Sequence, residues 1–225
     1  DDLRRVHWKS TARTGELMVR REEQPWESRA TVVLDTRSYA HRGEGPTASF
    51  EWAVSAAASI AVHLRQSGYK LRLVTGSGID VNATEAGGDG LLLDYLADIR
   101  LSQRDDVATL VERVRQRSDG GMVIALLGTL SSTEAELLAG LRGSGATCTA
   151  FLMDSSTWLN LTPTARAEAQ HAHATAALGL LRSGWRVVSV EHGSKLPTLW
   201  PQAARGSQGF AWRAALAETV AGGVR

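Results

Sequence analysis

The chain has 225 residues, enough for one large α/β domain or for two small domains. Its 25 basic and 24 acidic residues give a formal net charge of +1, which argues against the basic face that nucleic-acid binding requires. No apolar run approaches the roughly 20 residues that a membrane-spanning helix needs, and we find no secretory signal. Cys148 is the single cysteine, and its apolar neighbours predict a buried strand residue.

The first 28 residues differ in character from the rest and form an N-terminal extension. Residues 1–12 are polar and basic and predict a short helix, and residues 16–22 predict an edge strand. The sequence starts abruptly and without Met, so we expect it to be a piece of a longer protein. The remainder of that protein would carry membrane anchors or another domain.

From residue 29 onward, strands alternate with helices, starting with a strand over residues 30–35 that is buried on both faces. Further strands are expected at residues 71–75, 120–127, 146–153 and 185–190, with a short extra strand at 79–82. Helices are expected at residues 47–66, 89–100, 106–117, 131–141, 164–183 and 208–221. This alternation predicts a three-layer, doubly wound, mostly parallel α/β sheet, with residues 29–225 as one domain.

Polar residues follow several of the predicted strands, at the edge where doubly wound sheets bind ligands. The candidates for binding are Asp35, Arg37, Ser38, Thr129, Asp154 and Ser155. Two carboxylates with nearby hydroxyls are able to hold a hard divalent cation. Alternatively, each carboxylate caps its own turn or pairs with an arginine, which is the commoner use of such residues.

No catalytic constellation emerges from the sequence. Walker-type phosphate loops and Gly-x-Ser-x-Gly elbows are missing, and the glycine pairs sit in turn contexts. His171 and His173 are two residues apart on a predicted helix, so they cannot face one ion and are expected to be solvated or half-buried. We therefore predict no enzyme and no cofactor. The rival interpretation is an enzyme or ligand sensor that uses Asp35, Asp154, Ser155 and His192.

Seven tryptophans fall into two groups. Trp52, Trp185 and Trp212 lie on predicted elements and are expected in the core. The others, Trp8, Trp26, Trp158 and Trp200, lie in the extension or in loops. They are expected to fasten these segments to the sheet, the alternative being that some are exposed contact residues.

A short motif in the extension consists of Asp1, Asp2, Arg4, Arg5, Trp8, Lys9, Ala12 and Arg13. This pattern, followed by a strand and then by a strand that ends at Leu34 and Asp35, resembles the domain of unknown function 58 family. The resemblance implies a von Willebrand factor A-like, Rossmann-type domain. It also implies two membrane-spanning helices upstream and genes for MoxR-type AAA+ ATPases nearby.

Von Willebrand factor A domains commonly bind partners through a metal held by the motif Asp-x-Ser-x-Ser after the first strand. The matching positions here are Asp35, Arg37 and Tyr39, so only the aspartate is kept. A later strand-end aspartate of the family corresponds to Gly128 or Thr129. The resemblance thus implies a lost metal site, and we expect Arg37 to neutralise Asp35 instead.

We therefore expect a non-enzymatic protein-interaction domain, the cytoplasmic part of a membrane-anchored protein, with a MoxR-type AAA+ ATPase as partner. The strand-end loops would contact the partner, together with a basic interaction segment made of Arg4, Arg5, Trp8, Lys9 and Arg13. Membrane contact is expected only through segments missing from this chain. A further alternative is that residues 4–21 touch anionic lipid beside such anchors.

Overall fold

The computed structural model describes residues 28–77, 80–83, 88–116 and 121–205. One sheet of six strands runs through it, in the order β3-β2-β1-β4-β5-β6. The strands are β1 (Arg29–Leu34), β2 (Lys70–Thr75), β3 (Asp80–Ala83), β4 (Met122–Leu127), β5 (Thr147–Met153) and β6 (Arg186–Val190). The N-terminal extension, with its expected helix, edge strand and interaction segment, lies outside the described residues.

All strand pairs are parallel except β2 with β3, which are antiparallel. β1 lies between β2 and β4, and its Val32 and Val33 point to opposite faces yet are both fully buried. A strand covered on both faces reads as a continuous apolar run, which explains why its position was predictable. The expected doubly wound, mostly parallel α/β sheet is confirmed.

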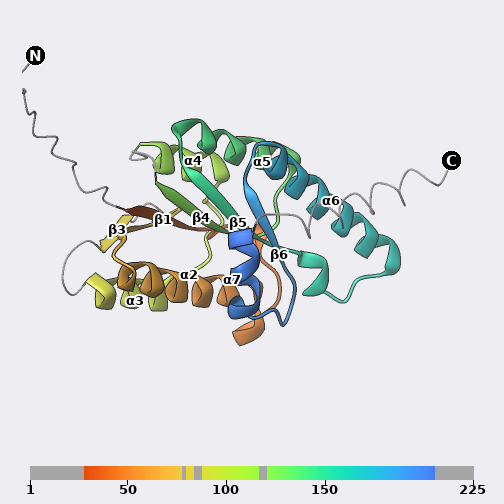
Figure 1. Cartoon of the computed structure of the whole chain (residues 1–225). Helices are drawn as coiled ribbons and strands as arrows, with labels where there is room; N and C mark the ends of the chain where they lie inside the picture. Colours follow the sequence, from red (N-terminus) through yellow and green to blue (C-terminus); the bar gives the residue numbers. More distant parts are fainter. Residues whose placement is uncertain (1–27, 78–79, 84–87, 117–120, 206–225) are drawn as a thin grey trace, which may run out of the picture.

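Helices cover both faces of the sheet (Figure 1). One face carries α2 (Ser49–Gln66), α3 (Gly88–Asp98) and α7 (Leu196–Arg205). The other carries α4 (Val107–Arg115), α5 (Ser132–Ala139) and α6 (Pro163–Arg182). The two hydrophobic clusters therefore lie on opposite sides of one sheet.

The helix starts follow the capping signals in the sequence. Ser131 and Glu134 form a reciprocal capping box at the start of α5. Asp106 caps α4, and Thr162 caps α6 with Pro163 in the first turn. These local hydrogen bonds fix where the strand-end loops become helices.

The segment around Pro197 and Pro201 corrects the sequence prediction, which treated it as a connection to a helix at residues 208–221. It forms α7, with Pro201 inside the helix. Leu199 and Ala203 lie four residues apart on its buried side, and the Trp200 ring stacks on Phe151 with centroids 6.3 Å apart. This apolar packing outweighs the backbone hydrogen bond that the proline removes. Residues 208–221 lie outside the described residues.

Of the tryptophans that the structure describes, Trp185 lies in the core as expected, whereas Trp52 packs against the core but is only partly buried. Trp185 is buried, and Trp52 donates from Nε1 to the Ser194 carbonyl at 2.7 Å. Trp158 donates to the Thr47 carbonyl at 2.9 Å. Trp8, Trp26 and Trp212 lie outside the described residues. Within the part of the chain described, no helix is both long and apolar enough to cross a bilayer.

Candidate functional site

Strand order reverses between β1 and β4, where the sheet has its topological switch point. The loop that follows β1 starts at Asp35, whose backbone N–H donates to the Leu126 carbonyl at 3.0 Å. It continues through a short 3-10 turn at Ser38–Ala40. The candidate residues Asp35, Arg37, Ser38 and Thr129 therefore all lie at this crevice.

The Asp35 carboxylate is 1% exposed and fully engaged. Its Oδ1 accepts from Arg37 Nε at 2.9 Å and from the Arg37 backbone N–H at 3.1 Å. Its Oδ2 accepts from Arg37 Nη2 at 2.7 Å and from the Gly128 backbone N–H at 3.0 Å. The expected neutralisation of Asp35 by Arg37 is confirmed, in the bidentate geometry that guanidinium groups favour.

The Arg37 side chain uses all five of its N–H donors. Besides the two bonds to Asp35, Nη2 donates to the Thr129 carbonyl at 3.1 Å. Nη1 donates to Tyr39 Oη at 3.3 Å and to Glu134 Oε1. Burial alone would lower the pKa of Arg37, but the hydrogen bonds and charges of Asp35, Tyr39 and Glu134 outweigh it and raise the pKa above its ordinary value.

Glu134 connects this ion pair to the first turn of α5. Its Oε2 accepts from the Ser131 backbone N–H and hydroxyl at 2.8 and 2.9 Å. Its Oε1 also accepts from Tyr39 Oη at 3.2 Å. The Tyr39 ring lies 5.1 Å from the Arg37 guanidinium carbon and is 51% exposed. Tyr39 therefore covers the buried cation and presents its ring to solvent.

The crevice itself is filled by the backbone of the β1 loop. Thr129 donates its backbone N–H to the Ala40 carbonyl at 2.8 Å. A Cβ at Gly128 would come within 2.5 Å of that same carbonyl oxygen, so only glycine allows this approach. The Thr129 Oγ1 atom is buried and has no hydrogen-bond partner among the described residues. The two loops therefore lie in direct backbone contact at this point.

Further contacts hold the β1 loop from its other side. Thr36 Oγ1 donates to the buried Asp105 carboxylate at 2.5 Å, and the Ser38 backbone N–H donates to the Ser102 carbonyl at 2.9 Å. His41 bridges Ser49 Oγ at 3.1 Å and the Asp35 carbonyl at 2.9 Å. The carbonyl only accepts, so Nε2 carries the proton and Nδ1 accepts from the hydroxyl.

The second group of predicted residues does not join the first. Asp154 Oδ1 accepts from the Ser156 backbone N–H at 3.0 Å and from its hydroxyl at 2.7 Å, so Asp154 caps its own turn. Ser155 lies in that turn, and the exposed His192 packs edge-on against Trp158. β4 separates β1 from β5, which places the two groups about 10 Å apart across the sheet. The structure therefore does not combine Asp35 with Asp154, Ser155 and His192 in one cleft.

The residues at the switch point do not fit a divalent cation. Such an ion needs about six or more oxygen ligands. Both carboxylate oxygens of Asp35 already accept hydrogen bonds, from Arg37 and from the Gly128 backbone N–H. The Arg37 guanidinium lies among the same oxygens that a cation would use. Among the described residues, no group of three or more His, Cys, Asp or Glu side chains is arranged to hold a metal.

Sequence reasoning missed several residues of this network. Glu134 lies in the capping box of α5, and no local pattern pairs it with Arg37, 97 residues away. His41, Ser49 and Asp105 were not singled out. On the far side of the sheet, the half-buried His173 bonds to Ser189 Oγ at 2.9 Å, while His171 is exposed, in agreement with the expectation for this pair.

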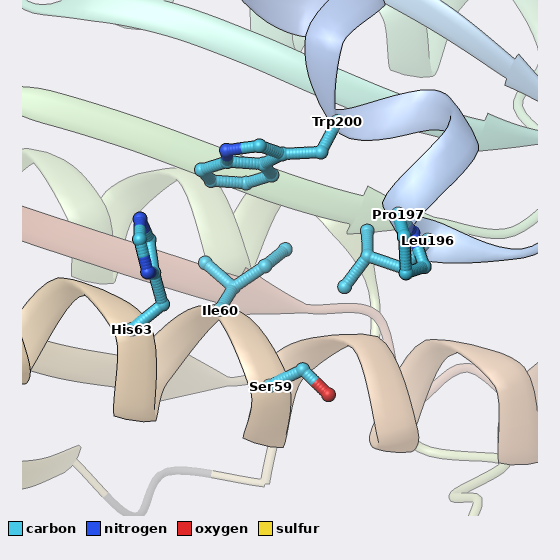
Figure 2. A pocket seen from close by; sticks show the side chains of 6 residues that line it. All are labelled: Ser59, Ile60, His63, Leu196, Pro197 and Trp200. Carbon is cyan, nitrogen blue, oxygen red and sulfur yellow. The ribbon is translucent and has the colours of Figure 1, made fainter.

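An apolar groove lies between α2 and α7, away from the switch point (Figure 2). Its volume is about 290 Å³. The groove is lined by Ser59, Ile60, His63, Leu196, Pro197 and Trp200. Figure 2 shows the Trp200 ring over Ile60, with the His63 ring at its edge at a centroid distance of 5.8 Å. This groove was not predicted, because α7, which forms one of its walls, was not predicted.

The strand order and the antiparallel edge strand define a doubly wound, von Willebrand factor A-like α/β fold, in which Arg37 pairs with Asp35 at the end of the first strand. The chain belongs to the DUF58 family, described as "Protein of unknown function DUF58", which matches residues 1–132. No curated protein matches the chain.

Solved structures with a similar arrangement include proximal thread matrix protein 1 from the mussel byssus. One structure of it is 15% identical, with a TM-score of 0.46, and covers 79% of this chain and 46% of the mussel chain. Another, with a zinc-occupied MIDAS motif, is 14% identical with a TM-score of 0.48 and covers 79% and 47%. This chain thus spans about half the length of the mussel protein. An uncharacterized membrane-spanning protein from Vibrio fischeri is 13% identical, with a TM-score of 0.27, and covers 80% of this chain and 98% of that one.

Proposed function

We propose that this chain is a non-enzymatic protein-interaction domain of a membrane-associated protein, and that its partner is a MoxR-type AAA+ ATPase. The observation that carries the proposal is the saturation of the strand-end groups. Both oxygens of Asp35 and all five donors of Arg37 are bonded within the domain. Groups engaged in this way have no capacity left for a substrate or a nucleophile, whereas a rigid surface is what a protein partner needs.

The contact surface proposed here is the rim of the switch point. Tyr39 is 51% exposed, and Leu101 is 40% exposed. Leu101 precedes Ser102, whose backbone exchanges hydrogen bonds with Thr36 and Ser38, so the two loops lie side by side. Exposed aromatic and aliphatic side chains on a fixed backbone are typical anchors of protein interfaces. The choice of a MoxR-type ATPase follows from the family resemblance of the N-terminal motif.

The direct test is the affinity of the purified chain for the MoxR-type ATPase of the same organism. We expect the Tyr39→Ala/Leu101→Ser variant to bind at least about tenfold more weakly, because it removes both anchors. Leu91→Ser is the matched control. Leu91 is an exposed leucine, 70% accessible, in the first turn of α3. It lies about two helical turns before the end of that helix, and Leu101 follows the end of the helix. Equal affinity of the rim variant and the wild type, or no measurable binding by the wild type, would refute the proposal.

The basic interaction segment is tested separately with the same partner. Charge reversal of Arg4 and Arg5 to Glu is expected to weaken binding and to make the remaining binding less sensitive to salt. If reversal leaves partner binding unchanged but abolishes sedimentation with anionic vesicles, the segment contacts lipid and the partner surface is confined to the rim.

A further inference from the structure

We propose that the Arg37 guanidinium is a built-in cation that takes the place of a divalent ion, so that the strand-end surface keeps one conformation without any bound metal. The proposal concerns the state of the site and does not depend on which partner the surface binds. It rests on the chemical identity of the atoms around Arg37.

Every atom that receives a hydrogen bond from the Arg37 side chain is an oxygen. These atoms are Asp35 Oδ1 and Oδ2, the Thr129 carbonyl oxygen, Tyr39 Oη and Glu134 Oε1. They come from the loop after β1, the loop after β4 and the first turn of α5. Together they form an oxygen cage with two carboxylates, a carbonyl and a hydroxyl, which is the ligand set that hard divalent cations prefer.

Thr129 also carries a buried hydroxyl that takes no part in these hydrogen bonds. Thr129 Oγ1 is buried and lacks a hydrogen-bond partner among the described residues, although the carbonyl of the same residue accepts from Arg37. An unsatisfied buried hydroxyl is costly and rare. Once the guanidinium is removed, the five oxygens that it now bonds lose their donors, and water would complete the ligand number that Mg²⁺ or Ca²⁺ requires.

The charge balance supports the same conclusion. Asp35 is 1% exposed, and two carboxylates brought this close repel each other unless a cation lies between them. Arg37 supplies one positive charge and, unlike a bound ion, cannot dissociate, because it is part of the chain. We infer that the loop geometry of the wild type is independent of divalent ions, and that removing the guanidinium exposes a latent cation site.

The experiment compares thermal unfolding of the wild type and of Arg37→Ser in EDTA, Mg²⁺, Ca²⁺ or Mn²⁺. The wild-type Tm is expected to be the same in all four conditions. The variant should have a lower Tm in EDTA and recover by about 5 °C or more at a cation concentration far above its Kd. Asp35→Asn/Arg37→Ser is the matched control, and it should not recover because the cage has lost its buried charge.

Three outcomes would overturn the proposal: saturable cation binding by the wild type that Asp35→Asn abolishes, a folded Arg37→Ser that gains nothing from any of the ions, or equal recovery by the double variant. Should Arg37→Ser fail to fold in buffer, it is refolded from urea with and without Ca²⁺ or Mn²⁺. Refolding only with the ion supports the cage, and failure in both conditions counts against it. Arg37→Lys should remain insensitive to cations, since it keeps a covalent positive charge.

Discussion

The buried ion pair between Asp35 and Arg37 makes a quantitative prediction for stability. The side chains are 1% and 2% exposed, and their closest nitrogen and oxygen are 2.7 Å apart. Removing one partner of such a pair leaves the other charge buried, which typically costs about 3–5 kcal/mol. Arg37→Ala should therefore lower the free energy of unfolding by about this amount and lower Tm by roughly 10 °C.

The assay is urea unfolding followed by tryptophan fluorescence, arranged as a double-mutant cycle. Asp35→Ala, Arg37→Ala and the double variant are compared with Arg100→Ala, an exposed arginine that should change stability by less than about 0.5 kcal/mol. The double variant leaves neither charge of this pair buried without its partner. Its loss in free energy of unfolding should therefore be smaller than the sum of the losses in the two single variants. Single losses below about 1 kcal/mol, or additivity within about 0.5 kcal/mol, would refute the view that this pair is buried and coupled.

Three further predictions concern other parts of the domain. Burial lowers the pKa of both His41 and His173, so the unfolded chain binds more protons than the folded one below about pH 6.5. The free energy of unfolding should therefore fall as the pH drops from about 7 to 5, which the urea midpoint measures. The His41→Asn/His173→Asn variant should show a weaker dependence of the urea midpoint on pH. Burial raises the pKa of the Cys148 thiol to about 11, so a disulfide reagent should react only after unfolding, and rapid reaction of the native chain would contradict the buried strand position. Gly128→Ala places its Cβ within 2.5 Å of a backbone oxygen and should cost about 1–3 kcal/mol in urea unfolding, whereas Gly90→Ala meets no atom within 4 Å and should not destabilise.

The sheet was predictable from the sequence because its central strands are apolar on both faces. The runs at β4 (Met122–Leu127) and β5 (Thr147–Met153) are nearly fully buried, and they were located to within two residues at either end. The antiparallel direction of β3 was not predicted, because a strand of four residues carries no signal for its direction. α7 was missed because two prolines outweighed the apolar spacing of Leu199 and Ala203 in the sequence argument.

The candidate site was predictable only in part, for a similar reason. Asp35 and Arg37 are two residues apart, so their pairing followed from the motif in which an arginine replaces a serine. Glu134 is 97 residues from Arg37, and the two meet only because β4 lies next to β1 in the sheet. Periodicity predicts strands but not their order, so contacts that depend on strand order remain hidden. The same holds for Asp105, which lies 69 residues from Thr36.

The β1 loop is held by contacts from three directions, which favours a rigid surface at the rim of the switch point. Arg37 ties it to α5 through Glu134, His41 ties it to the start of α2, and Thr36 ties it to Asp105 before α4. Since each contact is buried or half-buried, breaking one leaves unsatisfied polar groups and strains the others. An ion shifts a conformational equilibrium only when it binds two states differently, and these three contacts all favour the one arrangement in which Arg37 occupies the oxygen cage. Partner binding at this rim should therefore be the same in EDTA and in Mg²⁺, and a strong dependence on Mg²⁺ in the wild type would mean that Arg37 leaves the cage in solution.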